Sequence, residues 1–127
     1  MRSIAKEMLK IYKPFSDLDW MNYKLIKRDI TYHHILKKSD GGKMEINNGA
    51  LLMPDSHAYL HLIESIDINM YILLNKIFKD INNQGYEPEL YQRYIIENIL
   101  LEFESNHKWD KGYKGKLLIK RKYLERW

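Results

Sequence analysis

The sequence predicts an α+β fold that is mostly helical and forms a single domain. Apolar residues recur at helical spacing in four segments, at about 3–12, 57–65, 67–84 and 89–104. Between the first two lies a stretch rich in β-branched and aromatic residues around a Gly-Gly turn, which is typical of a β-hairpin. A chain of 127 residues is long enough for one hydrophobic core. We therefore expect a hairpin packed on several helices.

The first helix should span Ser3 to Tyr12 and end before Pro14, because proline cannot continue a helix. Residues 16–29 are compatible with either a second short helix or an irregular lead-in. After them, "ITYHHILKK" predicts a strand, "SDGGK" a tight turn, and "MEINNGALLM" the return strand. Within the return strand, Asn47-Asn48-Gly49 predicts a second turn or a bulge.

Three helices should follow the hairpin. Pro54 stops the strand, and Asp55 or Ser56 can cap the amides of a helix that runs to about Ser65. The next helix is expected over 67–84 and the last over about 89–104, separated by Gly85 and Pro88. The expected core face of the first of these is Met70, Leu73, Leu74, Ile77, Phe78 and Ile81. The expected core face of the second is Leu90, Tyr94, Ile95, Ile99, Leu100 and Phe103.

Composition excludes several classes of protein. No apolar run is long enough to cross a bilayer, and the opening "MRSIAKEMLKIYKPF" lacks the apolar core of a signal peptide. We therefore expect a cytoplasmic protein with no membrane partner. The chain has no cysteine, so a metal would be held by imidazole, carboxylate or carbonyl oxygen.

The net charge of +4 is unevenly distributed, because basic residues gather in the tail at about 108–127 among two tyrosines and two tryptophans. This pattern fits contact with phosphate, and a solvated basic terminus is the plain alternative. The candidate nucleic-acid contacts are Lys37, Lys38, Lys43, Lys116, Lys120, Arg121 and Lys122.

Four of the five histidines lie close together in the sequence, as the adjacent pair His33 and His34 and the spaced pair His57 and His61. Residues four apart on a helix share a face, so the spaced pair can chelate one cation. Imidazole suits zinc, nickel, manganese or copper better than magnesium. Neighbours in a regular strand point to opposite faces, so the adjacent pair can meet one site only if the strand twists or ends there.

Taken together, "YHHI", "NNGALL" and "HAYLH" give the order strand, strand, helix with histidines at both ends. This arrangement resembles the HNH endonuclease family, whose ββα-metal fold holds one divalent cation between hairpin and helix. From Asn48 the two helix histidines fall at +9 and +13, as in the colicin-type DNase branch, which also has a His-His pair. The resemblance covers about 31–65, which leaves 67–106 as helical support.

The resemblance implies a role for each residue of the pattern. His34 would be the general base that takes a proton from the attacking water, since imidazole titrates near neutral pH. His33, His57 and His61 would bind one divalent ion, with zinc expected in a purified sample and nickel, manganese or magnesium as alternatives. Asn48 would hold the loop so that the His34 ring faces the water. The implied partner is nucleic acid, with DNA expected.

Many HNH proteins also carry two Cys-x-x-Cys pairs, which are missing here, so packing must hold this fold. Three hypotheses remain open from the sequence. The first is a small metal-dependent HNH nuclease. The second is a metalloprotein that does not cut and acts by binding, such as a phage-encoded inhibitor of a CRISPR effector or another host defence nuclease. The third is a structural histidine cluster without metal.

Overall fold

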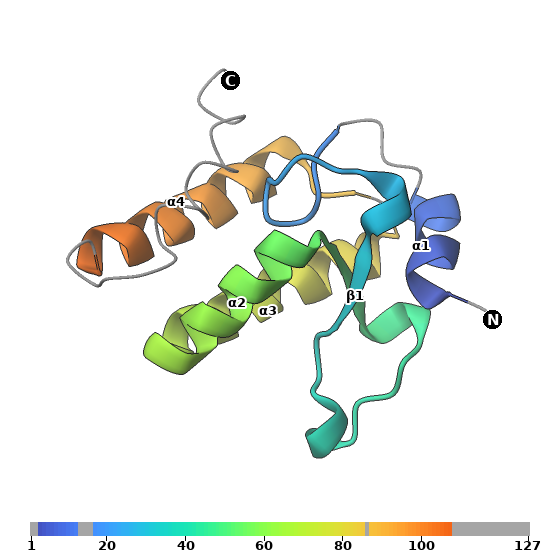
Figure 1. Cartoon of the computed structure of the whole chain (residues 1–127), viewed down its shortest axis with the longest axis horizontal. Helices are drawn as coiled ribbons and strands as arrows, with labels where there is room; N and C mark the ends of the chain where they lie inside the picture. The colour runs from blue at the N-terminus through green and yellow to red at the C-terminus, as the bar shows by residue number, and fades with distance from the viewer. Residues whose placement is uncertain (1–2, 13–16, 86, 108–127) are drawn as a thin grey trace.

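The computed structural model describes residues 3–12, 17–85 and 87–107. Within this part of the chain, four α-helices accompany one two-stranded antiparallel sheet, which confirms a mostly helical α+β fold (Figure 1). The helices and strands, in chain order, are α1 (Ile4–Tyr12), β1 (Thr31–His34), β2 (Gly49–Leu52), α2 (Pro54–Ile66), α3 (Ile68–Gln84) and α4 (Leu90–Asn106). Three short 3-10 turns are η1 (Lys27–Asp29), η2 (Lys38–Asp40) and η3 (Ile46–Asn48).

The hairpin is shorter than predicted. β1 pairs with β2 from Thr31 opposite Leu52 to His34 opposite Gly49, and the chain between them extends away from the helices (Figure 1). The Ile35 amide still donates to the main-chain carbonyl of Asn48, but the pairing stops at Leu36, whose N–H and C=O both bond to the Asn48 side chain. The predicted second turn within the return strand is present as η3.

Two glycines of the hairpin lie where a side chain would collide. A Cβ on Gly42 would overlap the Leu36 carbonyl, and one on Gly49 would overlap the Tyr32 ring and approach Met8. Glycine is therefore required by close packing at both positions.

The helices begin and end close to the predicted residues. The Asp67 carboxylate accepts a hydrogen bond from the Met70 amide and caps α3, and Gly85 ends that helix in the left-handed conformation with φ of 75°. Glu89 and Gln92 form a capping box at the start of α4. By contrast, residues 17–26 form no α-helix; they form an irregular segment with one bridge, Leu18 to Lys24, which settles the open alternative.

The core lies between the hairpin and the helices and includes Trp20, Leu52, Leu60 and Phe78, all almost fully buried. α2 and α3 lie side by side on it (Figure 1). α3 packs with its predicted face, except that Leu73 is exposed. In the part of the chain that the structure describes, no helix is both long and apolar enough to cross a membrane.

The predicted core face of α4 is wrong over its first half. Leu90, Tyr94 and Ile95 are exposed, while Leu100 and Phe103 are buried as expected. The helix is turned so that the Arg93 guanidinium reaches the interior, where it donates to the main-chain carbonyls of residues 18 and 19. The residues of α4 that are buried are Gln92, Arg93, Ile96, Leu100, Phe103 and Glu104.

Candidate metal centre

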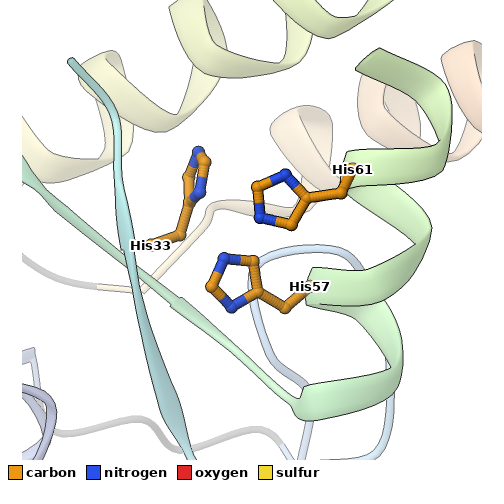
Figure 2. A group of neighbouring side chains, drawn as sticks. All are labelled: His33, His57 and His61. Carbon is orange, nitrogen blue, oxygen red and sulfur yellow. The ribbon is translucent and has the colours of Figure 1, made fainter. Parts of the chain in front are cut away.

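Three of the four clustered histidines converge on one point. His33 lies on β1, and His57 and His61 lie one turn apart on α2 (Figure 2). One ring nitrogen of each lies within 4.8 Å of the others. The rings of His57 and His61 are stacked with centroids 4.8 Å apart, and the His33 ring stands edge-on to them. This is the set that the sequence predicts as metal ligands, and three imidazoles so placed could hold one metal ion.

The second ring nitrogen of each histidine bonds to an oxygen outside the cluster. His33 Nε2 donates to Asn75 Oδ1 at 2.8 Å. His61 Nδ1 donates to Glu64 Oε1 at 3.3 Å. The Thr31 hydroxyl donates to a backbone carbonyl of β2 and so accepts from His57 Nδ1 at 3.2 Å.

These bonds decide which nitrogen atoms are left for a cation. They leave His33 Nδ1, His57 Nε2 and His61 Nε2, each with its lone pair free. Histidines that bind metals usually donate the other ring N–H in this way, which fixes the orientation of the ring and raises its basicity. The cluster thus has both the ligands and the outer hydrogen bonds of a metal site.

Burial keeps two of the imidazoles neutral. It lowers the pKa of His33 to about 4, although the hydrogen bond that His33 donates to Asn75 acts to raise it. Burial and the nearby charge of His61 lower the pKa of His57 to about 4. Because a metal binds the neutral imidazole, both side chains are ready to bind at neutral pH.

His34 borders the same site. It lines, with the three clustered histidines, an open depression of about 380 Å³. Its ring stands edge-on to Tyr32 with centroids 4.9 Å apart. β1 ends at His34, so the alternation of a regular strand does not continue beyond it. The other residues around the depression are Tyr32, Lys37, Lys38, Glu64 and Tyr71.

Asn48 clamps the loop that follows His34. Its Oδ1 accepts from the Leu36 amide at 2.8 Å, and its Nδ2 donates to the carbonyls of Leu36 and Lys43, each at 3.0 Å. The side chain is almost fully buried. Asn48 therefore touches the loop rather than the depression.

The predicted phosphate contacts fall in different places. Lys37 forms an ion pair with Glu64 and lies over the Tyr71 ring, so its charge is already balanced. Lys38 is exposed at the depression, and Lys43 lines a separate groove. The four basic residues predicted in the tail, Lys116, Lys120, Arg121 and Lys122, lie outside the described residues.

A buried carboxylate fixes the start of the helix that carries two of the clustered histidines. Asp19 is 1% exposed and accepts from the amides of Met21, Tyr23 and Met53 and from the Ser56 hydroxyl. It therefore ties the irregular segment before β1 to the first turn of α2. His57 follows directly on this turn.

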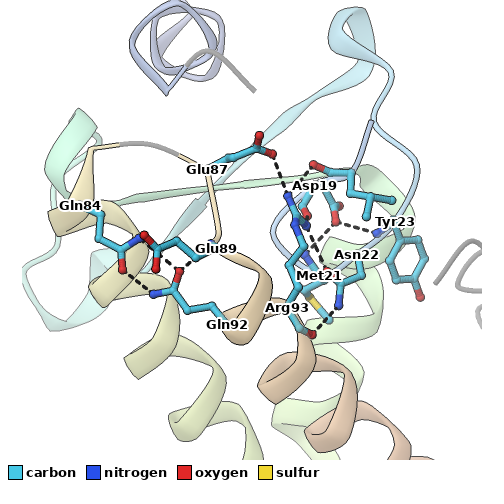
Figure 3. Close-up of polar contacts among 10 residues, drawn as sticks. Asp19, Met21, Asn22, Tyr23, Gln84, Glu87, Glu89, Gln92 and Arg93 are labelled. Atoms are coloured by element: carbon cyan, nitrogen blue, oxygen red, sulfur yellow. Dashed lines mark hydrogen bonds and ion pairs between the residues drawn. The ribbon is translucent and has the colours of Figure 1, made fainter. Parts of the chain in front are cut away.

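The same region contains a buried ion pair. Arg93 donates to Glu87 at 3.0 Å, to Asn22 and to the Asp19 carbonyl, and both charged side chains are 3% exposed (Figure 3). Asn22 returns a hydrogen bond from its amide to the Arg93 carbonyl and has a φ of 69°. α4 is thereby joined to the segment that holds α2.

Sequence reasoning missed the outer partners Thr31, Glu64 and Asn75. Glu64 could have been found, because it follows His61 by three residues and so shares its face of a helix. Asn75 gives no such signal, since it lies 42 residues from His33.

No protein-family model, no curated protein and no solved structure matches this chain. The geometry of the site is therefore the basis for assigning a function.

Proposed function

We propose that this protein is a small metal-dependent nuclease of HNH type that hydrolyses phosphodiester bonds of nucleic acid, with DNA as the expected substrate. The observation that carries the proposal is the set of three imidazoles whose free nitrogens converge while their other nitrogens are hydrogen-bonded outward. A fourth imidazole, His34, lines the same depression and is left for proton transfer.

The donor set fits a divalent transition metal. Three neutral imidazoles suit zinc, nickel or manganese better than magnesium, which prefers oxygen. Catalytic zinc sites commonly use three protein ligands and keep a fourth position for water or substrate. The open depression beside His57 and His61 leaves room for a phosphate at that position.

A bound cation would supply a positive centre that stabilises the charge developing on the phosphate and on the departing oxygen. A ring nitrogen of His34 takes a proton from a water molecule whose oxygen attacks phosphorus. The bond from phosphorus to the departing ester oxygen breaks, and that oxygen takes up a proton from solvent. Asn48 keeps the loop after His34 in one conformation, and Asn75 keeps the His33 ring in place.

The test combines metal analysis with DNA nicking. The purified protein is analysed for bound metal, and supercoiled plasmid is incubated with it in Mg²⁺, Mn²⁺, Ni²⁺ or Zn²⁺. We expect metal at about one ion per chain and nicking that falls at least 100-fold in His34→Ala. His57→Ala should lose metal as well as activity. His107→Ala is the matched control, because this histidine lies at the end of α4 against Phe103.

Two results would contradict the nuclease. Bound metal without cleavage under any of these conditions would indicate a metalloprotein that acts by binding, as an inhibitor of a defence nuclease does. Lack of metal, with His57→Ala less stable than wild type, would indicate a structural histidine cluster.

A further inference from the structure

A second concave surface lies next to the metal centre. It is a groove of about 600 Å³ between the loop that follows His34 and one face of α3. Its loop side includes Leu36 and Lys43, and its helix side includes Asn75, Lys76 and Lys79. The groove is therefore built from both the clamped loop and a helix.

The groove carries an excess of positive charge. Among the residues that the structure describes, three lysines line it, Lys43, Lys76 and Lys79, against one carboxylate, that of Glu45. Lys79 Nζ donates to the Asn47 carbonyl at 2.7 Å, which holds this ammonium at the wall beside the loop. Lys76 is exposed. A groove with this balance favours an anionic ligand.

The groove and the histidine depression share a wall. Tyr71 lines the depression, whereas Asn75, Lys76 and Lys79 line the groove, and all four lie on α3. Asn75 connects the two, since it lines the groove and its side chain accepts the hydrogen bond from His33, which lines the depression. Eight residues of helix separate Tyr71 from Lys79, or about 12 Å at 1.5 Å per residue. One nucleic-acid strand covers that distance with about three or four nucleotides.

The wall on the loop side is held rigidly. Asn48 bonds to the backbone of Leu36 and Lys43, and Gly42 packs so tightly against the Leu36 carbonyl that no side chain fits there. A groove that is already ordered can bind a ligand without the entropic cost of ordering a loop.

We infer that this groove holds the phosphate backbone of the nucleic acid a few nucleotides from the phosphate that is cut, through Lys76 and Lys79 of α3. The inference rests on the proposed nuclease function and names a binding surface for its substrate. The contacts are charge contacts to backbone phosphates, so binding here is independent of sequence.

The test measures binding without cleavage. A fluorescent DNA oligonucleotide, single or double stranded, is titrated with the whole 127-residue chain in EDTA over a range of salt concentrations. Each lost phosphate contact lowers the slope of log K against log salt by about 0.7 to 0.9. Lys76→Gln/Lys79→Gln should therefore lower the slope by about 1.5 and weaken binding about tenfold or more at 0.1 M salt.

The control is Lys10→Gln/Lys27→Gln, which removes the same charge from exposed positions on α1 and η1, outside both the groove and the depression. It should keep the wild-type slope. Equal slopes in the two double variants would overturn the inference. Tighter binding of polyglutamate than of DNA would also overturn it, because that result would indicate an acidic protein partner. Circular dichroism melts confirm that both variants fold.

Failure of the two proposals can be told apart. If wild-type protein with metal nicks plasmid but the Lys76 and Lys79 variant keeps the wild-type salt slope, the groove is wrong and the nuclease stands. If the Lys76→Gln/Lys79→Gln variant lowers the slope of log K against log salt but the wild-type protein cleaves DNA with none of the metals, the groove stands as a binding surface. The catalytic proposal is then wrong.

Discussion

His33 takes its orientation from a residue far away in the sequence. Its side chain is buried with 3% exposure, and its Nε2 donates to Asn75 Oδ1. With that nitrogen engaged, only Nδ1 can bind a cation, and the ring cannot rotate without leaving a buried polar group unpaired. Asn75 therefore positions the His33 ring within the candidate metal centre.

Replacing Asn75 by alanine should weaken metal binding. Loss of an outer hydrogen bond to a ligating histidine commonly costs 10- to 100-fold in metal affinity, and we expect a decrease of this size for zinc. Competition with a chromophoric chelator measures the affinity. The matched control is Asn83→Ala, an exposed asparagine on the same helix, which should bind as tightly as wild type. Equal affinities in the two variants would show that Asn75 has no part in the site.

The lowered pKa values of His33 and His57 predict a loss of stability in acid. Both values fall from 6.5 to about 4 on folding, so the unfolded chain binds more protons between these pH values. The free energy of unfolding of the metal-free protein should therefore be highest above pH 6.5 and decrease as the pH falls toward 4. The contribution of His33 is at most on the order of 3 kcal/mol.

Urea unfolding in EDTA at pH 7 and pH 5 measures this difference. His33→Gln cannot take up the proton and should show a smaller decrease in stability between the two pH values than wild type. His107→Gln should behave as wild type. An unchanged pH dependence in His33→Gln would mean that His33 is not the group that titrates.

The sequence could predict that His33, His57 and His61 converge because the signals for their placement are local. His57 and His61 share a helix face by periodicity alone, and His33 is brought opposite them by a hairpin that the Gly-Gly turn makes evident. The partners of these ligands could not be predicted in the same way. Thr31 and Asn75 act through tertiary contacts, and neither residue type carries a signal of its role.

At the scale of single elements, the loop between β1 and β2 depends on one amide side chain. Asn48 makes three hydrogen bonds to backbone groups of Leu36 and Lys43 and is 9% exposed. Asn48→Ala would remove the side-chain partner of the Leu36 N–H and C=O, while the Lys43 carbonyl still accepts from the Glu45 amide, so we expect a loss of about 1 to 3 kcal/mol in the free energy of unfolding. Plasmid nicking should fall with it, because the loop begins next to His34.

The neighbouring asparagine gives a close control for this prediction. Asn47 is exposed, and the bond from Lys79 goes to its main-chain carbonyl, so Asn47→Ala keeps that contact. Chemical denaturation and nicking assays on the two variants make the comparison. Similar stability and activity in Asn47→Ala and Asn48→Ala would contradict the clamp.

Helix ends were predictable because their signals are chemical and local, as at Asp67 and Gly85. The rotation of α4 was not. The apolar period placed Tyr94 and Ile95 in the core, but a guanidinium that bonds to buried carbonyls must point inward whatever its neighbours are. The contacts of Arg93 with residues 18–22, more than 70 positions earlier, thus override the local pattern.

In the whole molecule, the buried network of Asp19, Glu87 and Arg93 joins segments from both ends of the described chain. Arg93→Ala would leave Glu87 as a buried charge without its main partner, and breaking such a pair costs about 3 to 5 kcal/mol. We expect a clear decrease in melting temperature by calorimetry. Arg28→Ala, at an exposed arginine, should melt as wild type. A small effect of Arg93→Ala would show that water replaces the guanidinium there.

The placement of the ligands on two elements has a kinetic consequence. β1 supplies His33, α2 supplies His57 and His61, and the whole hairpin loop lies between them along the chain. A cation bound to all three would close that stretch into a ring, and the strand could not leave the helix before a coordinate bond broke. Metal would then lower the rate of unfolding as well as raise the free energy of unfolding. The metal-bound protein should therefore survive proteases and heat for longer than the metal-free protein.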